Sequence, residues 1–419
     1  MTIVFALYAV MAIILLGIAV LNLWWMLDAW RTPDQMAATR FEEPADPRLS
    51  FSLLVPARHE EHVLGDTLDA MADLDHPDYE ILVIVGHDDH ATAAVARAAA
   101  RRHPHRVRVV LDHNWPKNKP KALNSALPRC RGTVVGVFDA EDTVAPGLLR
   151  HVDSCFQRSR AHIVQGGVQL MNVHTSWYAL RNVLEYFFWF RSRLHFHARA
   201  GFIPLGGNTV FFRRQLLARD GGWDNDCLAE DCEIGVRFST RGAKVAVAYS
   251  PELVTQEETP HSIRELVKQR TRWNQGFLQV MRKGTWRRLP TTNGRVLARL
   301  TLAMPFLQAF AGATIPLAII TLLLLDAPVL LTLLSFSPIL VIALTVLVEA
   351  VGLHEFCAAY GKRVRLRDYL RLILGTPLYQ AILAYAALRA AIREIRGQRG
   401  WEKTSHIGAH RPRPGLETT

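Results

Sequence analysis

Cysteine is scarce in this sequence. Only five of the 419 residues are cysteines, namely Cys130, Cys155, Cys227, Cys232 and Cys357. An odd and sparse set argues against a disulfide-stabilised scaffold and favours a reducing compartment. Cys227 and Cys232 also lack the spacing of a zinc knuckle. Glycine-rich P-loops, serine-hydrolase elbows and internal repeats are missing as well, which excludes the protein classes built on them.

The composition indicates a folded protein that meets a membrane. Half of the residues are hydrophobic and 21% are charged, which excludes a disordered chain as the main body. Lysine and arginine number 49 against 38 aspartates and glutamates, a net charge of +11. The arginines cluster beside apolar stretches, so anionic lipid and topology explain them better than nucleic acid. We therefore expect a lipid bilayer as a partner and no nucleic acid.

The first long apolar stretch lies at the amino end. Residues 3–27 contain no charge and are long enough to cross a bilayer. Trp24, Trp25 and Trp30 are placed like an interfacial belt, and a basic start and a cleavage site are not obvious. We interpret residues 1–28 as a retained transmembrane anchor.

Two further apolar stretches, residues 300–325 and 329–353, are separated by a turn at 326–328 and are typical of a helical hairpin. Basic residues flank the hairpin on both sides, so the positive-inside rule places both of its ends in the cytoplasm. The amino terminus is then outside and residues 28–299 are cytoplasmic. This predicts a multi-pass protein of the cell membrane.

The last apolar segment, residues 372–388, has the shortest length that can span a bilayer. A span would carry Arg393, Arg396 and Arg399 outward against the charge rule, so a re-entrant or interfacial helix is the preferred of the two interpretations. Residues 299–392 are thus a region of transmembrane or interfacial helices, and residues 393–419 are a basic tail.

Between the apolar regions, strands and helices alternate. Short apolar runs at 51–56, 79–85, 107–111 and 133–139 predict buried strands, and helices are expected at about 60–74, 91–103, 119–128 and 146–158. This alternation predicts an α/β domain with a largely parallel sheet, in which ligands bind beyond the carboxyl ends of the strands.

Two acidic clusters follow such elements. Asp139 and Glu141 leave a strand together, and carboxylates at this spacing can share one hard cation such as Mg²⁺ or Mn²⁺. Glu230 and Asp231 begin a helical stretch, where an aspartate could remove a proton from an attacking hydroxyl. The alternative for both clusters, and for Asp142 in particular, is ordinary capping of a helix start.

A third feature is a helix expected at about 261–282. Gln269, Arg272 and Trp273 share one of its faces, because residues three and four positions apart lie side by side on a helix. The amide of Gln269, the planar guanidinium of Arg272 and the flat ring of Trp273 are together suited to bind a pyrophosphate next to a sugar ring. The alternative is a solvated basic face with one buried tryptophan.

These features, in this order, resemble the family 2 glycosyltransferases, and in particular the membrane-embedded group that includes cellulose, chitin and hyaluronan synthases. The resemblance covers roughly residues 50–285. Its motifs are the opening strand and loop at 55–61, the K-x-x-A-L-N element at 119–124, a D-x-D-like motif at 139–141, a T-E-D-like motif at 229–231 and the full Q-x-x-R-W at 269–273.

The resemblance implies a GT-A fold over residues 50–285, a UDP-sugar donor, a bound Mg²⁺ or Mn²⁺ and an inverting reaction. It implies that Asp231 is the general base beside Glu230 and that Asp139 and Glu141 hold the metal. The residues expected to contact the nucleotide donor are Pro56, Arg58, Glu60, Asp88, Lys119, Asp139, Gln269 and Arg272. Gly207, Asn208 and Trp273 are expected to line the acceptor site.

Three positions depart from the family pattern. Glu141 replaces an aspartate and so moves a metal ligand, and Ala229 stands where threonine is usual. The aspartate that reads uridine normally follows the second strand directly, and Asp88 supplies it only with a displacement of a residue or two. The nucleotide base is therefore less firmly predicted than the reaction class.

The segment at 176–199 is rich in aromatic residues followed by arginines and histidines. A helix in the lipid headgroup layer and a plain core helix are equally compatible with this composition.

The leading functional hypothesis is a processive enzyme that extends a β-linked glycan from a UDP-sugar, with its catalytic domain on the cytoplasmic side. One alternative is transfer of a single sugar to a lipid acceptor, favoured because three or four helices hardly enclose a channel unless a homo-oligomer supplies the rest. The other is a catalytically silent membrane scaffold.

Overall fold

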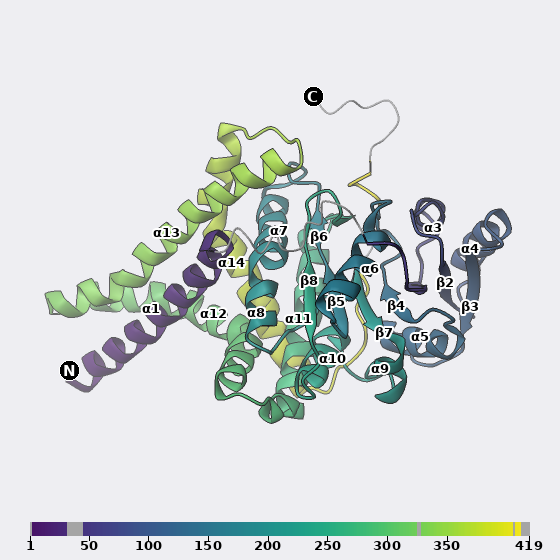
Figure 1. Cartoon of the computed structure of the whole chain (residues 1–419). Coiled ribbons are helices and arrows are strands. Elements are labelled where there is room, and N and C mark those ends of the chain that lie inside the picture. Colours follow the sequence, from purple (N-terminus) through teal and green to yellow (C-terminus); the bar gives the residue numbers. More distant parts are fainter. Residues whose placement is uncertain (1, 32–44, 325–327, 405–406, 412–419) are drawn as a thin grey trace.

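A computed structural model describes residues 2–31, 45–324, 328–404 and 407–411 (Figure 1). Its centre is a seven-stranded sheet in the order β3-β2-β1-β4-β7-β5-β8. The strands are β1 (Phe51–Ala57), β2 (Tyr79–Gly86), β3 (Val107–Asp112), β4 (Val134–Val137), β5 (Ile163–Gly166), β7 (Val210–Arg213) and β8 (Val245–Ala248). β1 to β4 are parallel, whereas β7 runs antiparallel to both of its neighbours. The predicted α/β class is confirmed, with a mixed sheet.

Helices cover both faces of the sheet, because the apolar side chains of its strands alternate in direction. On β1, Leu53 and Val55 pack against α3 (Leu64–Ala72), α4 (His90–Arg102) and α6 (Leu148–Ser159). Leu54 points to the other face, towards α5 (Lys119–Ala126) and α10 (Glu230–Ser239). A short parallel pair, β6 (Val168–Leu170) and β9 (Thr255–Glu257), lies beside the main sheet. α9 (Arg214–Arg219) follows β7, and α11 (Ile263–Lys283) follows β9.

The segment at 176–199 forms α7 (Trp177–Phe188), a π-helical turn (Trp189–Arg193) and α8 (Leu194–Arg199). Leu180, Val183 and Phe187 are buried against Leu353 and Phe356 of α13. The structure thus favours the core interpretation of this segment, in which α7 packs between the sheet domain and the apolar helices.

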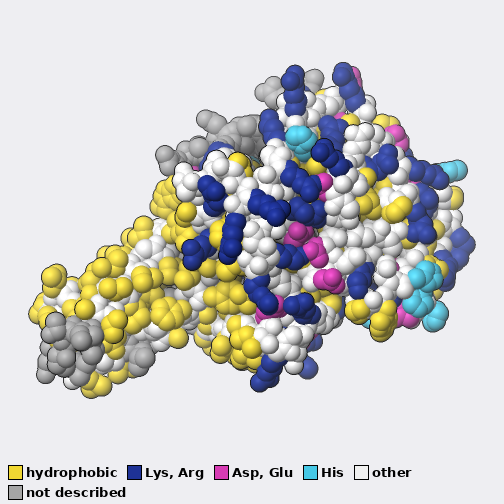
Figure 2. Space-filling view, turned by 90° about the horizontal axis from the view of Figure 1, so that it is seen from below, with side chains coloured by type: hydrophobic (Ala, Val, Ile, Leu, Met, Phe, Trp, Pro, Cys, Tyr) yellow, Lys and Arg dark blue, Asp and Glu magenta, His cyan; other side chains and the backbone are white. Residues whose placement is uncertain are grey.

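Four long helices carry the apolar sequence: α1 (Thr2–Arg31), α12 (Thr292–Leu324), α13 (Val329–Ala359) and α14 (Leu366–Ile395). Three described stretches are long and apolar enough to cross a membrane, at Phe5–Asp28, Val329–Ala359 and Leu366–Ile395. α1 and α13 lie side by side and project from the body (Figure 1), and apolar side chains cover the projecting part (Figure 2). The predicted stretch 300–325 lies mostly within α12, and residues 325–327 of the expected turn are outside the described residues.

The last apolar segment is part of a longer helix. Residues 372–388 form only the middle of α14, which has 30 residues, because flanking arginines continue the helix at both ends. A helix of this length can cross a bilayer, so shortness no longer argues against a span. α14 packs along α11, α12 and α7. It therefore joins the apolar helices to the sheet domain.

Candidate active site

One cavity of about 1330 Å³ begins beyond the carboxyl ends of β1, β2 and β4 and extends between α1, α12, α13 and α14. Every predicted site residue except Asp88 lines it. They are Pro56, Arg58, Glu60, Lys119, Asp139, Glu141, Gly207, Asn208, Glu230, Asp231, Gln269, Arg272 and Trp273. The three motif regions, distant along the chain, thus share a single space.

Lys119 joins the two acidic clusters. Its ammonium donates to the Asp139 carboxylate and, at 2.9 Å, to the carbonyl oxygen of Gly207. Burial works to lower the pKa of Lys119, but the negative charges of Asp139, Glu230 and Asp231 outweigh it and raise that pKa. Lys119 is therefore a firmly charged cation between the metal-type motif and the acidic helix start.

The cluster after β4 holds more carboxyl groups than the sequence motif alone indicates. Burial, together with the charges of Glu257, Asp139 and Glu141, raises the pKa of Asp142 well above its usual range. Asn208 donates to the carboxylates of Asp142 (2.8 Å) and Glu257. Such a concentration of carboxylates is electrostatically suited to a divalent cation.

The donor set available for that cation is incomplete without a ligand. Among the described residues, no group of three or more His, Cys, Asp or Glu side chains is arranged to hold a metal ion by itself. Asp139 and Glu141 therefore fit a cation that takes its other oxygens from a bound diphosphate or from water. The capping alternative for Asp142 is wrong, because its side chain accepts from the Asp139 amide (2.8 Å) and α6 begins only at Leu148.

Glu230 and Asp231 occupy the first turn of α10, with different exposure. Glu230 is 4% exposed and Asp231 is more open to the cavity. Burial and the neighbouring Asp231 charge raise the pKa of Glu230 to about 7, and burial also raises the pKa of Asp231. Lys119 and Arg272 oppose both shifts. A carboxylate with a raised pKa and access to the cavity is suited to accept a proton.

Two glycines allow the motifs to approach each other. A β-carbon at Gly207 would lie 3.0 Å from Asp231 Oδ2, and one at Gly276 would lie 2.4 Å from the β-carbon of Ala229. Gly276 therefore lets α11 pack directly on the backbone that leads into α10. Gly206, next to Gly207, is held by the buried Gln165, because the Gly206 backbone N–H donates to the side-chain oxygen of Gln165 at 2.9 Å.

The cavity face of α11 is polar and aromatic. Ser262 caps the helix by accepting from the Glu265 amide, and Gln269, Arg272 and Trp273 follow on one side. The Gln269 Oε1 atom is buried without a hydrogen-bond partner among the described residues. The Arg272 guanidinium lies 4.4 Å from the centre of the Trp401 ring. This face presents donors and acceptors to the cavity.

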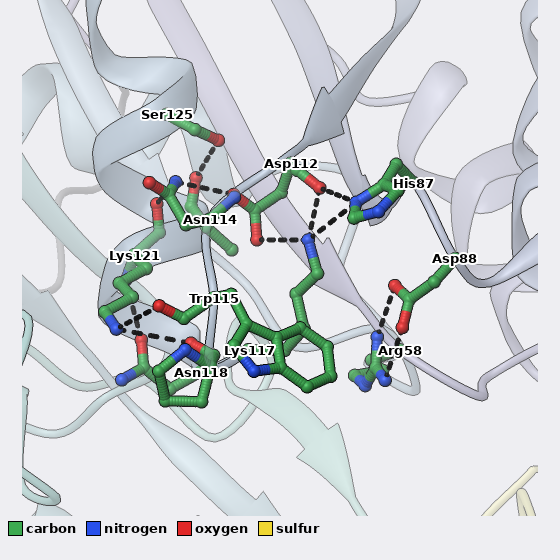
Figure 3. A network of polar contacts seen from close by, with 12 residues as sticks. Arg58, His87, Asp88, Asp112, Asn114, Trp115, Lys117, Asn118, Lys121 and Ser125 are labelled. Atoms are coloured by element: carbon green, nitrogen blue, oxygen red, sulfur yellow. Dashed lines mark hydrogen bonds and ion pairs between the residues drawn. The ribbon is translucent and has the colours of Figure 1, made fainter.

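The end of the cavity next to β2 and β3 contains an ion pair between two of the predicted nucleotide-contacting residues. Arg58 and Asp88 form a two-point ion pair at 2.9 and 3.0 Å, and Asp88 lies outside the cavity lining (Figure 3). The Arg58 hydrogen bonds lower the pKa of Asp88. Asp112 and Lys117 line the cavity instead, and the Lys117 ammonium lies 3.1 Å from His87 Nδ1.

The carboxyl-terminal segment covers one side of the site. Trp401 stacks on Arg272, and Lys403 pairs with Glu60 at 2.8 Å. Further on, Arg411 donates to the carbonyl oxygens of Val63 and Glu141 at 3.0 and 3.1 Å. The described part of the predicted basic tail 393–419 is therefore packed on the domain, and residues 412–419 are outside the described residues.

Several site residues were missed by sequence reasoning. Gln165, Glu257, Asp112, Lys117 and Trp401 belong to no motif that was singled out, and only folding brings them to the cavity. Asp112 and Lys117 follow a strand end, and that position alone could have drawn attention to them.

Comparisons with known proteins agree with this architecture. A family model described as "Glycosyltransferase like family 2" matches residues 47–276. Beta-monoglucosyldiacylglycerol synthase of Trichormus variabilis is 28% identical over 232 residues, which cover 54% of this chain and 49% of that protein. Poly-beta-1,6-N-acetyl-D-glucosamine synthase of Staphylococcus epidermidis is 23% identical over 282 residues, covering 67% and 66%. The chain spans about half the length of the glucosyldiacylglycerol synthase.

Among solved structures, the mannosyltransferase PcManGT from Pyrobaculum calidifontis, in complex with GDP-Man and Mn²⁺, matches with a TM-score of 0.59. The match covers 93% of this chain and 99% of that one at 20% identity. This likeness confirms the expected GT-A fold.

Proposed function

The chain belongs to the glycosyltransferase like family 2, and from this premise we propose that it transfers one sugar from a nucleotide-sugar donor to a lipid acceptor at the membrane. The observation that carries the proposal is the single cavity that joins Glu230 and Asp231 to the apolar helices. Its far part is lined by side chains such as Ile18 of α1, Ile339 of α13 and Leu383 of α14. Acyl chains can lie in such a space while a headgroup reaches the carboxylates.

In this proposal the reaction is a single inverting displacement. Asp231 takes the proton of the acceptor hydroxyl while the hydroxyl oxygen forms a bond to the anomeric carbon of the donor sugar. The bond from that carbon to the nucleoside diphosphate breaks, and the nucleoside diphosphate leaves. Lys119, Arg272 and Gln269 hold the diphosphate, and Trp273 lines the acceptor side. Asp139 and Glu141 would hold a divalent cation, Mg²⁺ or Mn²⁺, which supplies charge neutralisation at the diphosphate when bound.

The donor is proposed to be a UDP-sugar, as the motif resemblance implies. PcManGT is named in complex with GDP-Man and Mn²⁺, which supports a nucleotide sugar and a metal as a general class. The proposed cytoplasmic placement of the sheet domain is supported by the arginines that flank α12 and α13.

Extension of a β-linked glycan is the second candidate. It is supported by the likeness to the poly-N-acetylglucosamine synthase and by polar side chains, among them Asn22, Gln308 and Gln380, in the intramembrane part of the cavity. A homo-oligomer would then be needed to enclose a channel.

The decisive experiment uses the purified full chain in lipid nanodiscs with a panel of UDP-sugars, Mn²⁺ or Mg²⁺ and candidate lipids. We expect UDP release together with a glycolipid that carries one sugar, detected by mass spectrometry. Products of increasing length would support the polymer candidate instead. An absence of nucleotide release with every UDP-sugar would contradict the proposed donor class. Asp231→Asn is expected to bind UDP normally but to lose at least about 100-fold in turnover.

A further inference from the structure

Three arginines near the π-helical turn approach the apolar helices, but only two have acidic partners. Arg191 pairs with Glu355 of α13, and Arg199 pairs with Asp28 of α1 at 2.7 Å. Arg193 makes no ion pair and no hydrogen bond through its side chain within the described part of the chain, and its Nε atom is buried without a partner.

Aromatic rings hold Arg193 in place. Its guanidinium carbon lies 4.1 Å from the ring centre of Trp25 on α1 and 5.3 Å from that of Trp189. The indole Nε1 of Trp25 is also buried without a hydrogen-bond partner among the described residues. Both Arg193 and Trp25 line the cavity. Two donors that lack acceptors therefore lie together at its wall.

The charge of Arg193 is not compensated. Burial lowers its pKa to about 10, and Arg193 forms no ion pair with a carboxylate of the described residues. The guanidinium nevertheless stays charged at neutral pH. Neighbouring His197 supplies no negative charge, and burial together with the Arg193 charge lowers its pKa well below the usual range. A partly buried cation without an anion is costly, and a bound anion would reduce that cost.

The backbone that carries Arg193 forms a π-helical turn packed against α1. Arg193 closes the π-helical turn, in which the Leu194 amide donates to the Trp189 carbonyl five residues earlier. The wider turn is less stable than an α-helical one and is often retained at functional sites. Ser192 Oγ donates to the Trp25 carbonyl at 3.0 Å and fixes the turn against α1.

Arg193 is separate from the donor side of the cavity. Lys119 and Arg272 both lower the pKa values of Glu230 and Asp231, whereas the Arg193 guanidinium lies against the Trp25 ring of α1. The cavity wall near Trp25 continues instead along α1 through Asn22, Ile18 and Leu15. The unpaired cation thus faces the part of the cavity that leads into the membrane.

We propose that Arg193, together with the indole N–H of Trp25, binds the phosphate of a phospholipid acceptor whose headgroup also carries a free hydroxyl. The inference rests on the proposed lipid acceptor and names its class. The phosphate stays on Arg193 while the hydroxyl oxygen bonds to the anomeric carbon of the donor sugar. The bond from that carbon to the diphosphate breaks, the hydroxyl proton passes to Asp231, and a glycosylated phospholipid and a nucleoside diphosphate result.

The test measures binding first, so that it does not depend on turnover. Phosphatidylglycerol has both a phosphate and free hydroxyls, diacylglycerol has a hydroxyl only, and phosphatidylcholine has a phosphate without a free hydroxyl or net charge. Retention of each lipid by the delipidated full chain is measured by native mass spectrometry, and UDP binding by calorimetry. Arg193→Gln is expected to weaken phosphatidylglycerol retention about 10-fold or more, as for loss of a charge-assisted contact, with UDP affinity unchanged. Arg193→Lys keeps the charge and should recover part of the loss.

A matched control removes a neighbouring pair without leaving a charge unbalanced. Arg199→Gln combined with Asp28→Asn should retain phosphatidylglycerol like the parent protein.

Trp25→Phe keeps an aromatic ring but removes the indole N–H donor, and it should weaken phosphatidylglycerol retention by a few fold. This variant also tests the proposal if Arg193→Gln fails to fold.

The proposal would be overturned if Arg193→Gln, or Trp25→Phe where Arg193→Gln does not fold, retained phosphatidylglycerol as well as the parent protein does. It would also be overturned if the control pair lost as much retention as Arg193→Gln. A loss of UDP affinity alone in Arg193→Gln would overturn it too, because that result would assign Arg193 to the donor phosphates. If diacylglycerol is glycosylated and phosphatidylglycerol is not bound, the acceptor class is wrong while the proposed function stands. If phosphatidylglycerol binds through Arg193 but no lipid is glycosylated, the proposed function fails separately.

Discussion

Asp231 Oδ2 lies 3.0 Å from the position that a β-carbon would occupy at residue 207. The carbonyl oxygen of Gly207 accepts a hydrogen bond from the Lys119 ammonium at 2.9 Å. Gly207 therefore touches the proposed base on one side and the cation of the donor site on the other. No side chain fits there without moving one of them.

Replacement of Gly207 by alanine should impair chemistry more than folding. The added methyl group would press on the Asp231 carboxylate and shift it, and small misplacements of a catalytic group cost about 10- to 100-fold in rate. We expect turnover to fall by that factor while the thermal midpoint changes little. Gly206→Ala is the matched control, since its β-carbon would meet atoms only at 3.4 Å and beyond. Equal activity of Gly207→Ala and the parent would show that Asp231 is not held as the structure indicates.

The stability of the domain should fall with rising pH because of Glu230. Burial and the Asp231 charge raise its pKa from the usual 4.5 to about 7 in the folded state. Between these two values the folded state binds more protons at Glu230 than the unfolded state, so the contribution of Glu230 to stability is fully present below about pH 4.5 and is lost towards pH 7. Unfolding midpoints at several pH values check this for the parent and for Glu230→Gln. The variant should show a smaller decline over this window, and an identical decline in both proteins would remove Glu230 as its source.

The motif residues were predictable because each one stands at a place that the local sequence defines. Asp139 follows a strand with a clear apolar run, Glu230 and Asp231 begin a helix, and Trp273 shares a helical face with Gln269. Gln165 and Trp401 could not be found in this way. They act through contacts with residues 41 and 129 positions away, and one sequence contains no signal for such pairings. The full length of α14 was not predicted, since arginines flank its apolar segment and continue the helix at both ends.

The nucleotide base should be read by Lys117 rather than by Asp88. Lys117 lines the cavity and lies 3.1 Å from His87 Nδ1, whereas Asp88 is outside the lining and is engaged by Arg58 (Figure 3). Lys117→Met should therefore weaken UDP binding about 10-fold, in the range of a lost charge-assisted hydrogen bond. Asp88→Asn, which keeps the shape of the side chain, should change UDP binding by less than about 3-fold, as expected for an exposed ion pair. Calorimetric titration with UDP decides between them, and the reverse order would restore the motif-based prediction for Asp88.

The carboxyl-terminal segment should support donor binding through Trp401. Its ring lies 4.4 Å from the Arg272 guanidinium, and the neighbouring Lys403 pairs with Glu60 at 2.8 Å, so the segment orients two proposed donor contacts at once. A cation–π contact of this kind is worth about 0.5–1 kcal/mol where it is partly exposed, which corresponds to a rise of about 2- to 5-fold in donor KM for Trp401→Leu. Trp401→Phe retains a ring and should lie close to the parent, so the pair of variants separates stacking from bulk. Because Trp401 acts through Arg272 and not on the reacting atoms, kcat should stay within about 2-fold of the parent. A fall in kcat at unchanged KM would instead indicate that the segment takes part in the chemical step or in product release.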